Sequence, residues 1–254
     1  MARRFTDKGV VITGAGRGIG AALARAFSRD GARVFLCART DVEVRSVAEE
    51  ILAAGGRAGW TTVDVGEPDA ARALALMATS ELGRVDVLVN NAGILGPKAP
   101  LLECTPGNWN DVLRVNATGT FLVSRAFLPT MLQQQSGVIM NVSSGVGRKG
   151  RATWGPYAVS KFAVEGLSQV LAEEIGPQGL SCVAVNPGAT RTDMRAAAYP
   201  DEDPMTLPTA DQIAEAFLRI AALDASEING KSIDCRDIVA DLLQKPMSAS
   251  NAPG

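Results

Sequence analysis

Short apolar runs alternate with stretches in which apolar residues recur at helical spacing along most of the chain. The first run, Val10–Ile12, leads into a helical pattern from Ile19 to Phe27 that ends at Asp30-Gly31. The same reading predicts further strands at 33–38, 60–65, 85–89, 137–142, 180–186 and 232–234, and helices at 41–54, 68–82, about 105–135, 157–175 and about 209–223. Because the strands are apolar throughout and separated by helices, the pattern predicts a parallel sheet covered on both faces.

The domain organisation follows from the same pattern. No long linker and no internal repeat divides the sequence. We therefore expect one doubly wound α/β domain of Rossmann type over residues 1–254, with a parallel sheet of about seven strands. The tail 245–254, rich in Pro, Ser, Ala and Asn, is predicted to be mobile.

Composition narrows the class of protein. A net charge of −2 gives no indication of nucleic-acid binding. No apolar stretch approaches the ~20 residues that span a bilayer, and the N-terminus lacks the apolar segment of a secretion signal. The chain has no histidine, which excludes a Ser-His-Asp hydrolase and a histidine-based dehydrogenase. Its four cysteines show no C-x-x-C spacing, so we expect reduced thiols in a cytoplasmic protein and no metal site.

A glycine-rich turn follows the first strand. The segment Thr13–Gly20 carries glycines at 14, 18 and 20, where a strand passes into a helix. Glycine lets the backbone approach a pyrophosphate, and the helix N-terminus presents free N–H groups to it. We prefer this frame to one at Gly16, Gly18 and Ala21, because Gly14 is nearer the strand end. A tight turn with no ligand is the alternative.

The end of the second strand indicates which dinucleotide would bind. An acid at this position would hydrogen-bond the 2′-hydroxyl of NAD, but the chain has Ala38-Arg39 there and no acid before Asp41. Arg17 lies in the glycine turn itself. Two guanidinium groups suit a 2′-phosphate, so we expect NADP(H) rather than NAD(H); the alternative is that both arginines are merely solvated. Asp64, after the third strand, could bind the adenine amino group or cap the next helix.

A phenol and an ammonium are spaced for one helix face. Tyr157 and Lys161 stand four residues apart, and a nearby ammonium is expected to lower the pKa of a phenol from about 10. Such a pair could exchange a proton with a carbonyl or an alcohol. Ser144, at the end of a predicted strand, could hold the substrate oxygen, although a local turn bond is the alternative. Asn116 is unfavourable inside a helix unless its amide has a specific role.

These motifs together resemble those of the short-chain dehydrogenase/reductase family. The resemblance runs from about Lys8 to Asn186, and more loosely to Asp234. It rests on the glycine turn, Asp64-Val65, Asn90-Asn91-Ala92-Gly93, Asn116, Ser144, Tyr157-x-x-x-Lys161, and Asn186-Pro187-Gly188 with Thr192.

The resemblance implies roles for these residues. Tyr157 would be the general acid/base, Lys161 would bind the nicotinamide ribose and lower the tyrosine pKa, Ser144 would orient the substrate, and Asn116 would hold a relay water. The implied cofactor-binding set is Gly14, Arg17, Gly18, Ile19, Gly20, Arg39, Asp64, Val65, Asn91, Ala92, Gly93, Tyr157, Lys161, Pro187, Gly188, Thr190 and Thr192. The implied function is an NADPH-dependent oxidoreductase that transfers hydride between nicotinamide and a carbonyl or secondary alcohol.

The sequence departs from the family at its C-terminal end. The family commonly closes its last strand with a Gly-Gly pair, but this chain has Gly230–Asp237 without one. Residues of about 189–210 correspond to the substrate lid. Apolar residues are expected near the pocket, which favours a hydrophobic ketone or aldehyde: Ile94, Leu95, Val146, Trp154 and Met194. The basic loop with Arg148, Lys149 and Arg151 could attract an acidic substrate or simply be solvated.

The resemblance also implies a homotetramer, or a homodimer, assembled through the helices near 105–135 and 157–175. Two other functions stay open: a non-catalytic NADP(H)-binding regulator on the same fold, and a 3-oxoacyl thioester reductase as a specific substrate variant. An enoyl reductase or a sugar-nucleotide epimerase fits less well, because those branches space the tyrosine and lysine, or the glycines, differently.

Overall fold

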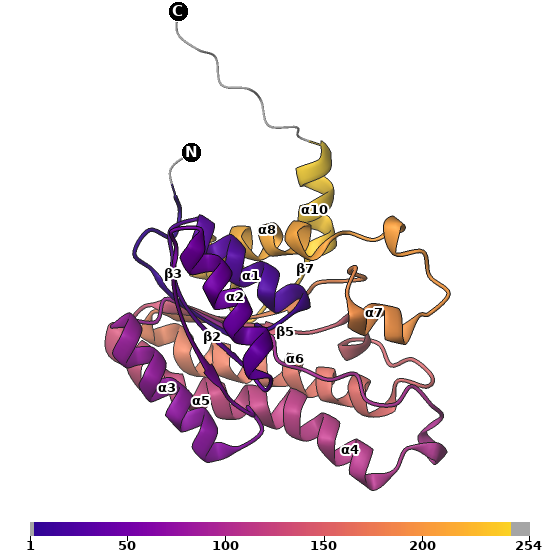
Figure 1. Ribbon diagram of the computed structural model, residues 1–254. Helices are drawn as coiled ribbons and strands as arrows, with labels where there is room; N and C mark the ends of the chain where they lie inside the picture. Colours follow the sequence, from indigo (N-terminus) through magenta and orange to yellow (C-terminus); the bar gives the residue numbers. More distant parts are fainter. Residues whose placement is uncertain (1–2, 245–254) are drawn as a thin grey trace, which may run out of the picture.

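Seven parallel strands form one sheet at the centre of the molecule (Figure 1). The structure is a computed structural model that describes residues 3–244. The strand order is β3-β2-β1-β4-β5-β6-β7. The strands are β1 (Gly9–Thr13), β2 (Arg33–Ala38), β3 (Arg57–Thr62), β4 (Val87–Asn90), β5 (Gly137–Val142), β6 (Leu180–Asn186) and β7 (Ser232–Asp234). The predicted doubly wound α/β fold is therefore confirmed for this part of the chain.

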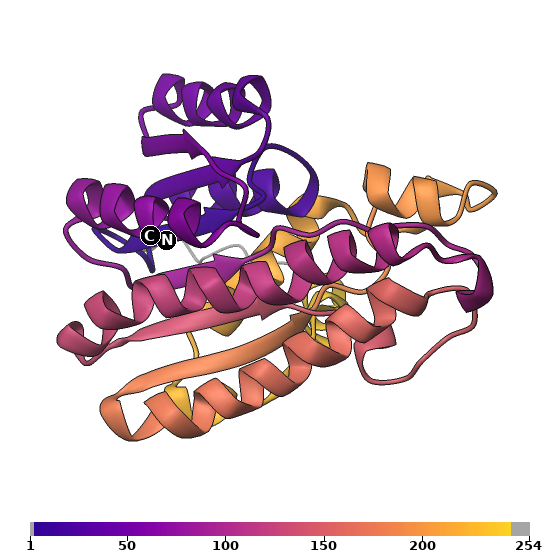
Figure 2. The ribbon, with the colours of Figure 1, turned by 90° about the horizontal axis from the view of Figure 1, so that it is seen from below.

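Helices cover both faces of the sheet, because successive strand residues point to opposite sides. Val10 and Ile12 of β1 pack into one core, and Val11 between them packs into the other. The first core is completed by α1 (Gly18–Arg29), α2 (Asp41–Ala53) and α8 (Ala210–Ala221). The second is completed by α3 (Pro68–Leu82), α5 (Gly119–Gln134) and α6 (Gly155–Ile175). Figure 2 shows α5 and α6 running side by side.

The third strand begins and ends earlier than predicted. We expected 60–65, but β3 spans Arg57–Thr62. Val63 and Val65 lie beyond the strand and are buried against α3 in the second core. Their apolarity marks burial in a loop rather than strand pairing, so this boundary prediction was wrong.

The predicted helix at 105–135 is interrupted. It consists of α4 (Pro106–Leu113), one π-helical turn (Arg114–Thr118) and α5. Short helices that the pattern did not predict follow later in the chain: α7 (Asp193–Ala198), α9 (Ala225–Ile228) and α10 (Cys235–Gln244). The tail 245–254, predicted to be mobile, lies outside the described residues.

The strand order fixes where a ligand can bind. The chain builds the sheet outward from β1 through β2 to β3, and then returns to the other side of β1 with β4. Connections therefore leave β1 and β4 in opposite directions at their carboxyl ends, which opens a crevice there. The glycine turn follows β1, and residues 91–93 follow Asn90, the last residue of β4.

Candidate active site

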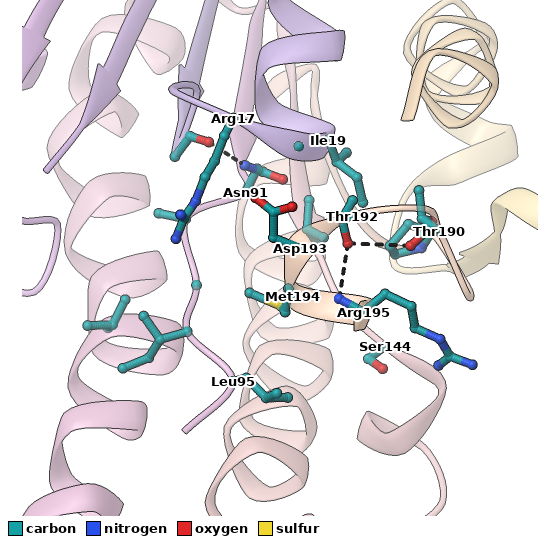
Figure 3. A pocket seen from close by; sticks show the side chains of 18 of the residues that line it. Arg17, Ile19, Asn91, Leu95, Ser144, Thr190, Thr192, Asp193, Met194 and Arg195 are labelled. Carbon is teal, nitrogen blue, oxygen red and sulfur yellow. Dashed lines mark hydrogen bonds between the residues drawn. The ribbon is translucent and has the colours of Figure 1, made fainter. Parts of the chain in front are cut away.

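A cavity of about 560 Å³ opens at the carboxyl edge of the sheet (Figure 3). Its lining contains most of the residues predicted from the sequence: Gly14, Arg17, Gly18, Ile19, Arg39, Asp64, Val65, Asn91, Ala92, Gly93, Ser144, Tyr157, Lys161, Pro187, Gly188, Thr190 and Thr192. Gly20 and Asn116 are not in the lining. The fold thus brings segments between Gly14 and Ala198 into one site.

The glycine turn is held against the end of β4. Gly14 has a φ of +64°, and a Cβ on it would stand 2.8 Å from the Cα of Ala92, so only glycine fits. The Asn91 amide donates to the carbonyls of Thr13 and Gly14 at 2.9 and 3.1 Å. No side chain caps the N-terminus of α1. Its first-turn N–H groups are therefore free to bind an anion beside the turn.

Arg17 and Arg39 both line this cavity. The Arg17 side chain is 70% exposed, and its Nη1 lies 3.8 Å from Glu43 Oε1. Glu43, in the first turn of α2, was missed by sequence reasoning because it stands five residues past the strand end where an acid was sought. A 2′-phosphate would have to draw Arg17 away from this loose surface pair.

Asp64 lines the cavity but is already engaged. It accepts a hydrogen bond from Arg114 at 3.0 Å and one from the Gly66 backbone N–H at 2.9 Å. Burial would raise the pKa of Asp64, but these bonds outweigh it and lower the pKa below the usual value. Glu67, not Asp64, is the N-cap residue of α3, so the capping alternative is wrong.

Tyr157 and Lys161 share one face of α6, as predicted. The Lys161 Nζ atom lies 5.6 Å from the centre of the Tyr157 ring and donates to the Val142 carbonyl at 2.7 Å. Ser144 follows β5 and lines the same cavity. The phenol, the ammonium and the serine hydroxyl therefore line a common space.

The expected lowering of the tyrosine pKa is not observed. Burial raises the pKa of Tyr157 to about 12, and the neighbouring Ser144 hydroxyl opposes that rise only in part. Burial likewise lowers the pKa of Lys161 to about 8. Desolvation disfavours the charged form of each group, and it is the largest cause of both shifts.

Asn116 sits behind the cavity wall and is fully buried. Its amide donates to the Ile94 carbonyl at 2.9 Å and to Ser160 at 3.0 Å, and its Oδ1 accepts from the Ile94 N–H at 2.8 Å. The π-helical turn that contains Asn116 explains how a residue unfavourable in a helix is accommodated. Asn116 thus ties α6 to the segment after β4.

The wall that follows β6 is held by local hydrogen bonds. The Gly188 N–H donates to Asn186 Oδ1 at 3.0 Å. Thr192 caps α7, because its Oγ1 accepts from the Arg195 N–H at 3.2 Å, as Figure 3 shows. Thr190 is buried beside it. The segment that follows Thr192 therefore starts as a capped helix.

The substrate end of the cavity is apolar and aromatic. Ile94, Leu95, Trp154 and Met194 line it as predicted, whereas Val146 packs behind them against the Trp154 cluster. The Trp154 and Tyr157 rings meet edge to face with centres 5.6 Å apart.

Cations surround Tyr199, which ends α7 and packs against Trp154. Lys98 Nζ stands 4.1 Å and the Arg195 guanidinium 3.9 Å from the centre of its ring. Arg195 also makes two bonds of 2.6 Å with Glu202. Arg151 donates to the Tyr199 hydroxyl at 2.5 Å. The Arg151 guanidinium therefore contacts the residue that ends α7.

Arg148 of the same basic loop is paired with an acid. Its Nη2 lies 2.6 Å from Asp234 Oδ1 in β7. Arg148 is thus bound to the atypical last strand, which is not the role of substrate attraction considered from the sequence.

Comparison with known proteins identifies the family of this chain. A family model described as short chain dehydrogenase matches residues 8–203. The chain is 40% identical to an uncharacterised oxidoreductase, YciK, of Escherichia coli K12, over 91% of this chain and 93% of that protein. It is 36% identical to a cis-4-hydroxycyclohexanecarboxylate dehydrogenase of Sinomonas cyclohexanicum, over 91% and 95%. A short chain dehydrogenase of Escherichia coli CFT073, crystallised with NADPH, superposes with a TM-score of 0.88 at 38% identity, over 93% and 99%.

The chain therefore belongs to the short-chain dehydrogenase family. It is an oxidoreductase that acts between CH–OH and C=O groups, and the predicted family is confirmed. Among the described residues, no helix is both long and apolar enough to cross a membrane.

Proposed function

We propose that the protein is an NADP(H)-dependent carbonyl reductase, or the same enzyme run as an alcohol dehydrogenase, with Tyr157 as its general acid/base. The observation that carries this proposal is the continuity of one cavity. The glycine turn and two arginines stand at one end, and the phenol, ammonium and serine hydroxyl stand at the other. A dinucleotide laid along it would end beside Tyr157.

The residues fit such a cofactor. Gly18 has a φ of +55°, a left-handed conformation that glycine adopts without strain, and it lies next to the Thr192 methyl group. The free N–H groups of α1 suit the pyrophosphate, and Arg17 and Arg39 suit a 2′-phosphate. That a similar protein was crystallised with NADPH supports the same choice. When bound, the nicotinamide would supply the hydride.

The protein's own residues would handle the proton. Because its pKa is raised to about 12, Tyr157 keeps its proton at neutral pH, which is the form needed to protonate a carbonyl oxygen. Ser144 would donate a hydrogen bond to the same oxygen and hold it beside the phenol. Lys161 would stabilise the phenolate left behind, and Asn116 would fix the segment that borders the lysine.

The lining favours an apolar carbonyl compound as substrate. Trp154, Leu95 and Met194 present mostly carbon surface next to Tyr157. The named activity of the Sinomonas relative, on an alicyclic alcohol that carries a carboxylate, points toward cyclic substrates of similar size. A 3-oxoacyl thioester is the competing substrate. Comparing the turnover of cyclic ketones with that of 3-oxoacyl thioesters would distinguish the two substrate classes.

The test is NADPH oxidation with a panel of cyclic ketones, aldehydes and 3-oxoacyl thioesters. Tyr157→Phe keeps the ring but removes the proton, so we expect the turnover rate to fall by roughly 10²–10⁴-fold, the usual contribution of general acid catalysis. NADPH affinity, followed by quenching of tryptophan fluorescence, should change little. Full activity in the variant would reject the role of Tyr157. If the wild-type protein bound NADPH tightly but turned over no carbonyl compound, the alternative function, a non-catalytic NADP(H)-binding regulator, would be favoured.

The proposal extends to assembly and location. Apolar side chains that are 42–55% exposed on α5 and α6 suit a subunit interface, and we propose a homotetramer built on these helices. The cysteines that the structure describes, Cys37, Cys104, Cys182 and Cys235, are all free thiols, which suits a cytoplasmic protein. We also propose that residues 1–254 act as one domain.

A further inference from the structure

A buried carboxylate lies on the same helix as the tyrosine and lysine but has no part in the proposed reaction. Glu165 is only 6% exposed and follows Lys161 by four residues in α6. That spacing places it one turn further along the same helix face. Glutamate is almost never this buried unless it is paired, so its partners indicate its role.

Three groups from other elements converge on one oxygen of Glu165. The Ser143 hydroxyl, at the end of β5, donates to Oε1 at 2.5 Å. The Ser232 hydroxyl, in β7, donates to the same atom at 2.9 Å. The Arg148 Nε atom lies 3.9 Å from it. Hydroxyl donors and a guanidinium suit an ionised carboxylate, which only accepts hydrogen bonds.

The partners of Glu165 are themselves held in place by the last strand. Arg148 is bound by Asp234, the final residue of β7, at 2.6 Å. The Asn186 amide, at the end of β6, donates to the same Asp234 carboxylate. Ser232 and Asp234 belong to the segment where this chain departs from the Gly-Gly pair of its family. The atypical strand thus supplies two of the side chains around Glu165.

We propose that Glu165 is a positioning residue for the proton transfer, because its carboxylate stabilises the ammonium form of Lys161, and that β7 holds it there through Ser232. This inference rests on the proposed function. The pKa of Lys161 supports it, since burial lowers that pKa to about 8 and the Glu165 charge is the one group that opposes the shift. Without Glu165 the lysine would lose its proton at a lower pH.

The charged and titratable groups that surround this pair come from four elements. Tyr157 stands on α6 itself, Arg148 on the loop after β5, Asp234 on β7 and Asp237 on α10. Arg148 and Asp234 neutralise each other at 2.6 Å. Arg148 also lies 3.9 Å from Glu165, so the two carboxylates share it, and Glu165 is the one that stands one turn from Lys161 on the same helix.

The first experiment is the pH dependence of carbonyl reduction in Glu165→Gln. In the wild-type protein Lys161, with a pKa of about 8, should lose its proton before Tyr157 does, so its deprotonation sets the alkaline limit of kcat/KM. In Glu165→Gln we expect this limit to move to lower pH by about one unit, the size expected of a nearby opposite charge. In Glu165→Asp, which keeps the charge, the alkaline limit of kcat/KM should lie close to its wild-type pH.

The matched control is Ser168→Ala. Ser168 is fully buried on the same helix and bonds Asn141 of β5 at 2.9 Å, but it carries no charge. This variant should loosen the contact of α6 with the sheet without moving the alkaline limit. If Glu165→Gln only lowered the rate equally at every pH, or if Ser168→Ala moved the limit as far, Glu165 would be structural and the proposal would be overturned.

A second experiment needs no catalysis. In urea unfolding at pH 7, Glu165→Gln should cost less stability in a Lys161→Met background than in the wild-type background, because the charge it stabilises is gone. Additive effects would overturn the proposal. This result stays interpretable even if no carbonyl is ever turned over, so failure of the inference and failure of the proposed function are separable. Ser232→Ala offers a milder variant if Glu165→Gln does not fold, and it should show the same coupling to Lys161→Met.

Discussion

Arg17 and Arg39 bring two guanidinium groups to the adenosine end of the cavity, where the glycine turn meets the end of β2. A planar guanidinium binds phosphate through paired hydrogen bonds, and these are stronger than bonds to a ribose hydroxyl. Replacing both arginines by alanine should therefore raise KM for NADPH by roughly 10- to 100-fold, since each lost charged bond is worth about 1.5–3 kcal/mol and the site is partly exposed. Steady-state kinetics with both cofactors would measure it.

The control for that experiment is NADH, which lacks the 2′-phosphate. Its KM should stay within a few-fold in the double variant, so that the preference for NADPH largely disappears. Glu43→Gln offers the opposite test, because it removes the carboxylate 3.8 Å from Arg17 and should tighten NADPH binding slightly. An equal loss for both cofactors would mean that the arginines support the turn and do not read the phosphate.

At the scale of elements, Asp86 fastens the amino ends of β1 and β4. It is 8% exposed, and it accepts from the Gly9 N–H at 2.9 Å, from Arg84 at 2.6 and 2.8 Å, and from Lys8 at 3.2 Å. Burial alone would raise the pKa of Asp86, but the bonds from Arg84, Gly9 and Lys8 outweigh it and lower the pKa below its usual value. The carboxylate therefore contributes stability that is fully present above pH ~4 and is lost as the pH falls through the folded pKa.

Asp86→Asn should lower the free energy of unfolding by about 1–3 kcal/mol at pH 7, with a smaller deficit near pH 3, because the carboxyl of the unfolded chain, with a pKa of about 3.9, is mostly protonated there. Urea titrations at the two pH values would measure this difference. Asp69→Asn is the control, because Asp69 is 90% exposed and pairs only with Arg72 on the surface. A deficit that did not shrink on acidification would contradict an electrostatic origin.

Elements whose side chains alternate between two cores were predictable from the sequence. β1, β2, β5 and β6 begin and end near the predicted residues, because their burial coincides with strand pairing. Val63 and Val65 did not follow this pattern. Both are buried in the second core, but they lie beyond the end of β3, where the pairing with β2 stops at Ala38. The short helix α7 was not predicted, because a capping threonine followed by a few alanines shows too little hydrophobic periodicity to indicate a helix.

The site divides in the same way. Tyr157 and Lys161 were predictable because their spacing on one helix defines their relation. The link from Glu165 to Ser232 was not, because it joins residues 67 positions apart, and only the order of the strands brings them together. The predicted lowering of the Tyr157 pKa was wrong for a related reason. The direction of a pKa shift depends on burial, which the local sequence does not reveal.

At the scale of the whole molecule, α5 and α6 form one layer on the sheet (Figure 2). This layer carries apolar side chains that are exposed to solvent. Phe121 on α5 is 44% exposed, and Val159, Phe162 and Val170 on α6 are 42–55% exposed. Single exposed apolar residues are common, but four on two adjacent helices suit a surface that another subunit covers. Two-fold pairing of this layer would bury it against its own copy.

Charge placed in this layer should therefore break the assembly. In Phe121→Glu combined with Val170→Glu, two or more carboxylates would face one another across a two-fold interface, at a cost of several kcal/mol. Light scattering at micromolar concentration should give four chain masses for the wild-type protein and one or two for the variant. Leu76→Glu on α3 is the control, because Leu76 is 74% exposed but lies outside this layer, so its mass should match the wild type. A monomeric wild-type protein would rule out the tetramer, and an unchanged mass in the double variant would move the interface to another face.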